Sequence, residues 1–366
     1  MSDRLRLAVR GAAVEIDLSR GGLTDLVFTV GGRDIRPLHR AHWVGGPVPA
    51  GLAPVEAALQ GDFLSAPFGR DDLCPGGPIH GPAANARWDV VSCTRAASAA
   101  EAVLALSQPV RGARIVKRLR LADGAPVLVT THEITGGSGT LTLAHHPMLR
   151  FAAPGRLSFS PKRAVLTGQG VAPGRHRLAV AARGEDPAAV PGGVPGAVAR
   201  DGGDVGATQD LTRWPWPPGH EDFCTLVEAA GATLGWTAAL RPAEDDLVFV
   251  LKDPSTLPVT MLWLSNGGRD HAPWDGRHLG VVGIEDGCTA GDEGNAAAAR
   301  GGSRVAREGV PSALPLAPGR VHRTWHAIGA VPRPAGWDSV ASIARRGARL
   351  RIEGQGPPLV LNLPDG

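Results

Sequence analysis

The sequence predicts an all-β fold, a large antiparallel β-sandwich with few short helices. The first observation is composition, because the 366 residues include 50 glycines and 32 prolines, about twice the usual share. Glycine weakens a helix through backbone entropy, and proline through a missing donor and a steric clash. The second observation is pattern, because short alternating or β-branched apolar runs recur between Gly, Pro and Asp. Many strands with few helical stretches between them are typical of antiparallel sheets packed face to face.

Runs with this pattern are distributed along the whole chain. We predict strands over Ala13–Leu18, Leu23–Val30, Ile115–Leu121, Val127–Ile134, Leu141–His145, Leu226–Ala230, Leu247–Leu251, Val259–Ser265, Leu279–Glu285, Thr324–Val331, Leu350–Glu353 and Leu359–Leu363. One segment, Asp338–Arg346, is predicted as a short helix, because Asp338 or Ser339 is suited to cap its first turn.

We expect residues 1–366 to form a single domain with two long surface loops. The segment 184–210 is rich in Gly, Ala, Pro and Asp and contains little to bury, and the segment 290–311 has the same character. Strand-like pattern resumes soon after each segment, so neither is predicted to be a linker between domains. Loops of this length usually have a function or lack fixed structure.

Composition and charge limit the partners of the chain. Hydrophobic residues make up 43% and charged residues 20% of the sequence, and the formal net charge is +3 without a long basic run. So small and scattered a charge indicates neither nucleic acid nor a membrane surface as a partner. No stretch approaches the roughly 18 apolar residues that a membrane-spanning helix needs. We expect a monomer or homodimer.

The amino-terminal segment and the cysteines point to a reducing compartment. Residues 1–6 lead into no apolar signal core, which predicts a cytoplasmic location. Cys74, Cys93, Cys224 and Cys288 lie far apart and form no Cys-x-x-Cys pair. A zinc knuckle or a dense disulfide framework is therefore not expected, and we predict buried, reduced thiols.

Three short motifs carry the residues best suited to acid–base chemistry. His80 lies in Pro-Ile-His-Gly-Pro, where glycine and proline favour irregular backbone, and His146 follows a strand-like run just before Pro147. Glu285 closes an apolar run. Burying a carboxylate without partners is costly, so Glu285 either faces solvent or is held in a site. An imidazole and a carboxylate brought together form an acid and a base that both work near neutral pH.

Neighbouring residues supply further candidates. Successive side chains on a strand point to opposite faces, so at most one of His145 and His146 enters a given pocket, and we favour His146. Arg70 follows a glycine and is suited to donate a fork of hydrogen bonds to vicinal hydroxyls. Trp214 lies in a rigid Trp-Pro-Trp-Pro-Pro stretch that suits an apolar platform, whereas Trp263 is expected in the core.

These motifs, in this order, resemble the galactose mutarotase-like superfamily, the aldose 1-epimerases and their hexose-phosphate relatives. The stretch His80–Trp88 is similar to the His-Gly signature of that group, which is followed by an Arg or Asn and a Trp. His146-Pro147-Met148 matches the place of the second histidine, although Met148 replaces the usual aromatic residue. Gly283–Asp286 resembles the Gly-Ile-Glu-Pro-like step, with aspartate instead of proline, and Leu316–Arg320 resembles a late Leu-x-Pro-Gly turn.

The resemblance implies a β-supersandwich enzyme that interconverts sugar anomers, an isomerase of monosaccharides. It implies Glu285 as base, His146 as acid, and His80 as a third catalytic group. No metal or organic cofactor is expected for this chemistry. The residues expected to contact the sugar are Arg70, Asn85, Trp88, His145, Asp222 and Trp214.

Other functions remain open at this stage. A non-catalytic carbohydrate-binding protein on the same sandwich would keep the aromatic and arginine contacts without needing the acid–base pair. An isomerase, lyase or hydrolase acting on a modified sugar would use the same carboxylate and imidazole. A metal site built from His80, His145 or His146 with Glu285 is a third alternative, but the spacing matches no local metal motif.

Overall fold

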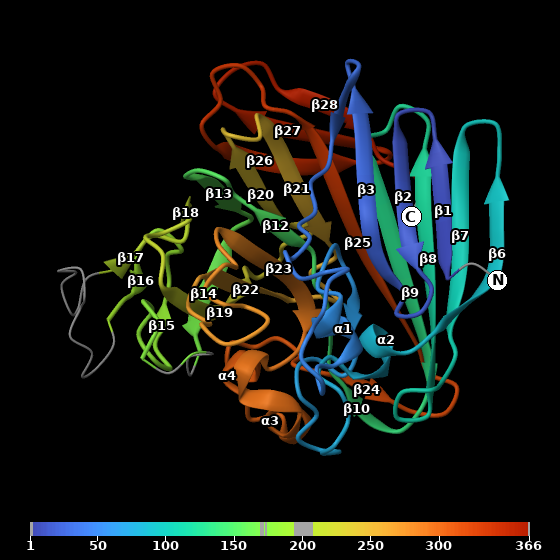
Figure 1. Ribbon diagram of the computed structural model, residues 1–366, viewed down its shortest axis with the longest axis vertical. Coiled ribbons are helices and arrows are strands. Elements are labelled where there is room, and N and C mark those ends of the chain that lie inside the picture. The colour runs from blue at the N-terminus through green and yellow to red at the C-terminus, as the bar shows by residue number, and fades with distance from the viewer. Residues whose placement is uncertain (1–2, 169–171, 173, 194–207, 365–366) are drawn as a thin grey trace.

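The computed structural model describes residues 3–168, 172, 174–193 and 208–364, and their architecture is built almost entirely from antiparallel sheets (Figure 1). In this part of the chain the largest sheet has nine strands. Their order is β18 (Arg213–Trp214), β13 (Gly155–Phe159), β20 (Gly235–Arg241), β21 (Asp246–Lys252), β25 (Val321–Pro332), β9 (Val127–Gly136), β8 (Ala113–Ala122), β7 (Ala99–Leu106) and β6 (Trp88–Arg95).

A second sheet, with eight strands among the described residues, carries the residues that matter for function. Its order is β15 (Arg183–Gly184), β14 (Lys162–Thr167), β19 (His220–Glu228), β22 (Val259–Asn266), β23 (Val281–Cys288), β11 (Leu143–His145) and β5 (Leu64–Ser65), with β12 (Met148–Arg150) also paired to β23. Within the same part of the chain, a four-stranded sheet contains β1 (Arg4–Val9), β2 (Ala12–Asp17), β3 (Gly22–Val30) and β4 (Arg33–Ile35), and a three-stranded sheet contains β26 (Val340–Arg346), β27 (Arg349–Gly354) and β28 (Leu359–Asn362). Two further sheets there have two strands each, one with β10 (Gly139–Leu141) and β24 (Leu314–Leu316), the other with β16 (Val190–Pro191) and β17 (Thr208–Gln209).

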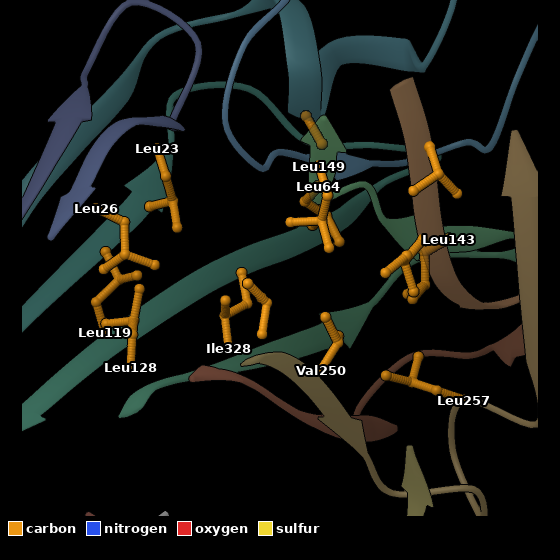
Figure 2. Packing of buried hydrophobic residues seen from close by; sticks show 14 of the residues in the cluster. Leu23, Leu26, Leu64, Leu119, Leu128, Leu143, Leu149, Val250, Leu257 and Ile328 are labelled. Atoms are coloured by element: carbon orange, nitrogen blue, oxygen red, sulfur yellow. The ribbon is translucent and has the colours of Figure 1, made fainter. Parts of the chain in front are cut away.

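The main core lies between the nine-stranded sheet on one side and the four- and eight-stranded sheets on the other. Its largest cluster of buried side chains takes residues from all three sheets. Figure 2 shows part of it, with Leu26 of β3, Leu119 of β8 and Val250 of β21 among the labelled side chains. A second apolar cluster lies under the sheet β26–β28, where Ile343 and Leu350 pack with Phe249 of the nine-stranded sheet. The predicted all-β sandwich is confirmed.

Helices are short and lie outside the sheets, at the front and bottom of the view in Figure 1. They are α1 (Pro54–Ala57), α2 (Gly81–Asn85), α3 (Gly294–Arg300), α4 (Arg304–Arg307) and a 3₁₀ turn over Gly291–Glu293. None of the helices in the described ranges is long and apolar enough to cross a membrane.

The helix predicted over 338–346 is wrong, because this segment forms β26. Val340 and Ile343 are three residues apart and both are buried, a spacing that resembles one face of a helix. On β26 the register against β27 shifts between Val340 and Ser342. Such a bulge inserts an extra residue, so two residues three apart face the same side of a strand. Gly347 then turns the chain with φ of +60° into β27.

The loop predictions need correction too. The segment 290–311 contains the 3₁₀ turn, α3 and α4, and the Ser303 side chain caps α4 by accepting from the Ala306 amide. In the segment 184–210, residues 194–207 lie outside the described residues. The rest contains β16 and β17, and Val190 there is fully buried.

The thiols are free, as predicted, but only two of them are buried. Cys224 and Cys288 lie in the interior, whereas Cys74 and Cys93 are exposed. Exposure of Cys93 follows from its place on β6, the edge strand of the nine-stranded sheet.

All lysines of the sequence are interior residues. Of the 38 lysine and arginine residues only three are lysines, Lys117, Lys162 and Lys252. Lys117 is 3% exposed, and the side chains of Lys162 and Lys252 are inaccessible. Lys162 and Lys252 both contact the Glu228 carboxylate, and Lys252 also lies 3.1 Å from Asp286. Burial lowers the pKa of Lys117 and of Lys162 to about 8.

One glycine next to the functional site has no room for a side chain. Gly61 has φ of +71°, and a Cβ atom there would lie 1.5 Å from the Leu23 carbonyl oxygen. That carbonyl belongs to a β-strand and does not move freely. Gly61 therefore sets the path of the chain just before Asp62.

Replacing Gly61 tests this constraint. Gly31 has a similar φ of +60° but open space around it, so it serves as the matched control. Gly31→Ala is expected to cost about 1–2 kcal/mol of unfolding free energy from the left-handed backbone alone. Gly61→Ala adds the steric overlap, a further loss of about 1–3 kcal/mol. Urea denaturation of both variants measures the difference, and equal losses would contradict the close packing at Gly61.

Candidate active site

A cavity of about 420 Å³ opens on the outer face of the eight-stranded sheet. On β19, β22 and β23, side chains such as Leu262 and Ile284 point into the sandwich, whereas Trp263 and Glu285 line the cavity. The segments around α1 and residues 68–80 and 291–294 complete its wall. The cavity brings together four of the residues predicted from the sequence: Arg70, His80, His146 and Glu285.

Pairing of β23 with two short strands brings His146 to Glu285. Ala144 of β11 pairs with Gly287, and Met148 of β12 pairs with Gly283, so the residues between them lie opposite Glu285. The Ile284 amide donates to the Pro147 carbonyl at 2.9 Å and fixes the segment between β11 and β12 against β23. His146 Nε2 lies 3.1 Å from Glu285 Oε1, with side chains only 5% and 2% exposed.

The two histidines of the cavity differ in charge. Burial lowers the pKa of His146, but Glu285 and then Asp62 outweigh burial, and the pKa lies above its ordinary value. Burial, followed by the charges of His146, Arg269 and Arg70, lowers the pKa of His80 well below the ordinary value. Near neutral pH the cavity therefore holds an imidazole with a tendency to be protonated beside a neutral one. Their ring centroids are 5.3 Å apart.

Local backbone geometry places His80. Its φ of +65° lies in the left-handed region, which residues other than glycine rarely adopt. Residues held in this region are often found at functional sites. The His80 amide donates to the Gly69 carbonyl at 2.7 Å, and the Ala66 amide donates to the His80 carbonyl at 3.1 Å. The ring is oriented by a 2.8 Å hydrogen bond between Nδ1 and the Ser65 hydroxyl. The irregular backbone expected around His80 is present.

An arginine that the sequence did not reveal occupies one side of the cavity. The Arg269 guanidinium lies 4.3 Å from the ring centroid of Trp274 and 5.3 Å from that of Trp263. Its Nε is 3.1 Å from the buried Glu221 carboxylate, to which the Trp263 indole also donates at 2.6 Å. Burial raises the pKa of Glu221, and Arg269 opposes that shift. Like Arg70, Arg269 follows a glycine, which is the one local signal for it.

Asp222, predicted to contact the sugar, does not line the cavity. Along β19, Cys224 and Leu226 belong to the interior cluster, and Asp222 faces the same side. It accepts from the Arg177 and Leu178 amides at 2.8 Å each. Side chains alternate along a strand, so Glu221 and Phe223 face the cavity side instead.

Four other expected sugar contacts also lie outside the cavity. Trp88 is fully buried and donates from its indole to the Ala83 carbonyl, and Trp214 is buried with its indole donating to the Gly280 carbonyl. Asn85 uses its side chain to brace the backbone, accepting from the Val55 amide and donating to the Ile79 and Gly81 carbonyls.

His145 is the fourth, because it points away from the cavity as the alternation on β11 requires. Its Nδ1 lies 3.3 Å from Asp62 Oδ2, and its ring stacks on that of His326 with centroids 3.8 Å apart. A polar layer thus lies beneath the cavity wall. In it His326 Nε2 is 3.4 Å from Asp286, the residue after Glu285.

Three residues of this layer are close enough to hold a metal ion, because ligand atoms of Asp62, His145 and His326 lie within 4.8 Å of one another. The two imidazole planes are only 10° apart. In-plane lone pairs of parallel stacked rings do not converge on one ion, as tetrahedral coordination requires. Burial and then the charges of His326 and Lys117 lower the pKa of His145 to about 4, although Asp62 opposes that shift. The group is a layer of stacked and ion-paired side chains, and its parallel rings do not suit a cation.

The raised pKa of His146 gives a direct test of the pair. Glu285→Gln removes the largest charge that raises this pKa, so the ring is expected to titrate at lower pH in an NMR pH series. The half-exposed His322 on β25 lies outside the cavity and serves as the internal reference signal. Because the folded pKa lies above 6.5, the pair stabilises the protein at low pH, and this stability is lost as pH rises through the folded value. An unchanged His146 titration in the variant would contradict the pairing.

No protein-family model and no curated protein matches the sequence. Solved structures do match the fold. A candidate mutarotase (YeaD) from Salmonella typhimurium aligns with a TM-score of 0.58 over 89% of this chain and 90% of its own, at 11% identity. The Slr1438 protein of Synechocystis sp. PCC 6803 aligns with a TM-score of 0.58 over 90% of this chain and 96% of its own, at 13% identity.

A galactose mutarotase-like protein from Clostridium acetobutylicum aligns with a TM-score of 0.55 over 89% of this chain and 94% of its own, at 14% identity. At these identities the similarity is one of fold. The fold implied by the short motifs is thereby confirmed: the chain has the galactose mutarotase-like fold.

Proposed function

We propose that the protein is an aldose 1-epimerase-like isomerase that interconverts the anomers of a monosaccharide. The observation that carries the proposal is the 3.1 Å contact between His146 Nε2 and Glu285 Oε1 in a cavity of about 420 Å³. The fold is shared with proteins whose names describe them as mutarotases or mutarotase-like. Fold alone does not define an activity, so the chemistry of the site is decisive.

The geometry suits a hemiacetal. Its anomeric hydroxyl and ring oxygen are attached to the same carbon, so a base and an acid that lie side by side reach both. Glu285 accepts the proton of the anomeric hydroxyl while protonated His146 donates to the ring oxygen, and the C1–ring oxygen bond breaks. The aldehyde group rotates about its bond to C2. Glu285 and His146 then exchange roles as the ring closes on the other face.

The raised pKa of His146 and the lowered pKa of His80 suit the two histidines to different roles, as proton donor and as hydrogen-bond acceptor. The raised pKa of His146 favours the protonated ring that the ring oxygen of the sugar needs as a donor. His80 stays neutral, and the Ser65 hydroxyl that orients it also contacts the Pro67 carbonyl at 3.3 Å. With the hydroxyl hydrogen directed to that carbonyl, His80 Nδ1 donates to Ser65 and its Nε2 is left to accept from a sugar hydroxyl.

Other lining groups would hold the rest of the sugar. Arg70 is exposed at the rim, and Arg269 is held by Glu221 through Nε, which leaves the end of its guanidinium to donate to hydroxyls. Trp263 and Trp274 offer apolar surface for the C–H groups of a sugar ring. Holding the substrate against the acid and the base in this way lowers the entropic part of the barrier.

Mutarotation followed by polarimetry tests the proposal. Each proton-transfer group typically contributes about 10²- to 10⁴-fold. Glu285→Gln and His146→Ala are therefore each expected to lower kcat by at least about 10²-fold across a panel of freshly dissolved aldoses, while circular dichroism shows a folded protein. Glu133→Gln, on the solvent-facing part of β9, is the control and should keep full activity.

Two results would count against the assignment. Full activity in either site variant would exclude the assigned proton transfers. Absence of acceleration with any sugar, together with retained sugar binding, would favour a carbohydrate-binding protein instead, and products other than anomers in NMR spectra would indicate a different sugar-modifying enzyme.

The charge of the cavity wall favours an uncharged sugar. Besides Glu285 the lining contains four carboxylates and only two arginines: Glu56, Asp72, Asp292, Glu293, Arg70 and Arg269. A phosphate group brings a charge of nearly −2 near neutral pH. Repulsion by a wall of the same sign lowers the local concentration of such a substrate.

We therefore expect kcat/KM for a free hexose to exceed that for its 6-phosphate by about tenfold or more. The difference should widen at low ionic strength, because salt screens exposed charges. Polarimetry with both substrates at two salt concentrations measures it. Equal or better turnover of the phosphate ester would contradict the preference.

A further inference from the structure

A buried carboxylate behind the cavity wall contacts the same histidine from the opposite side. The Asp62 side chain is 4% exposed, and its Oδ1 accepts from the His146 backbone amide at 2.8 Å. Its other oxygen lies 3.3 Å from His145 Nδ1. Both oxygens are thus directed to the two adjacent histidines, only one of which faces the cavity.

Several backbone bonds fix Asp62 in place. The Leu23 amide donates to the Asp62 carbonyl at 2.7 Å. The preceding Gly61 donates to the His39 carbonyl at 2.8 Å and accepts from the Met148 amide at 3.0 Å. The segment Gly61–Asp62 is therefore hydrogen-bonded both to β3 and to the start of β12, which directly follows the turn that carries His146. A carboxylate held so firmly acts as a preorganised group.

The charge of Asp62 is not cancelled by the residue that it bonds. Burial raises the pKa of Asp62, but His145, His326 and the hydrogen bond from the His146 amide outweigh burial and leave the pKa below its ordinary value, so the group is a carboxylate at neutral pH. His145 itself, with a pKa of about 4, is neutral there. Asp62 also interacts with the buried Lys117, and its negative charge raises the pKa of His146.

We infer that Asp62 is a positioning residue of the acid–base pair, which fixes the backbone at His146 and holds a negative charge behind its imidazole. The inference rests on the proposed function, since it assigns Asp62 to the acid of that reaction. His146 then lies between two carboxylates, Glu285 in the cavity and Asp62 behind the wall. Burial opposes protonation of His146, and the other groups around the cavity are neutral His80, 5.3 Å away between ring centroids, and the arginines Arg70 and Arg269.

A structural role and an electrostatic role predict different results. If Asp62 only supported the fold, its removal would lower activity equally at every pH. If its charge keeps His146 protonated, removal moves the alkaline limb of the kcat profile to lower pH, because the acid loses its proton earlier. Binding of the sugar, which Asp62 does not contact, should then change little.

The test is Asp62→Asn, which keeps an oxygen to accept from the His146 amide and removes the charge. The new amide group can donate to His145 Nδ1, because His145 Nε2 has no described partner and the ring is free to change tautomer. We expect the His146 titration, followed by NMR, to move to lower pH, because the Asp62 charge raises the pKa of this ring. The alkaline limb of kcat should move with it, while KM stays within about twofold, as for a group outside the binding cavity.

Asp222→Asn is the matched control. Asp222 is equally buried, accepts from two backbone amides and lies 2.6 Å from His220 Nδ1, but it faces away from the cavity. It should leave both the His146 titration and the pH profile in place. Asp62→Ser, which is smaller and also uncharged, should shift both like Asp62→Asn, so the test does not depend on how an asparagine fits.

The NMR titration separates the two proposals. A His146 titration that stays in place in both Asp62 variants overturns the role of Asp62, whatever the activity of the protein. A downward shift in a protein that accelerates no mutarotation leaves the Asp62–His146 coupling intact and refutes the enzymatic function. A uniform loss of kcat at all pH values, with no shift of the limb, also overturns the inference.

Discussion

Alternation of side chains on antiparallel strands is the constraint on which this site depends. His145 and His146 are adjacent residues, as are Glu285 and Asp286, and the two pairs lie opposite one another where β23 meets β11 and β12. One member of each pair faces the cavity and the other faces the sandwich interior. A shift of one residue in this pairing would exchange the two layers and bury the wrong imidazole and the wrong carboxylate.

The same two residue types thus serve two environments a few ångströms apart. In the cavity, Glu285 raises the pKa of His146. In the interior, burial lowers the pKa of His145 to about 4, and Asp286 contacts a lysine. Burial alone would favour neutral imidazoles everywhere, so the difference comes from the neighbouring charges, Glu285 beside His146 and His326 beside His145. The interior layer gives the wall of the cavity a polar support instead of an apolar one.

Much of the fold and the centre of the site could be predicted from the sequence. Alternating runs gave correct positions for strands such as β3, β9 and β22, since tertiary burial and local pattern agree there. The segment 338–346 failed because a bulge imitates helical spacing. His80, His146 and Glu285 were found since short motifs surround each of them. Asp222 was expected in the cavity but faces the interior, because nothing local indicates which residues of an alternating strand face a cavity.

Asp62 and Arg269 could not be found in that way. The importance of Asp62 arises from contacts with residues 83 and 84 positions later in the chain, and Arg269 is defined by two tryptophans and a distant glutamate. No local pattern encodes such contacts. These contacts depend on which strands pair in the fold, and strand pairing cannot be read from a single sequence.

The interior position of the lysines has a practical consequence. The ε-amino groups of Lys117, Lys162 and Lys252 are enclosed, whereas the surface cations are arginines. Reagents that acylate amines need an accessible nitrogen, and the folded chain offers them none at these three positions. The rate at which such a reagent labels lysine would accordingly report how often the sandwich opens, without any engineered probe.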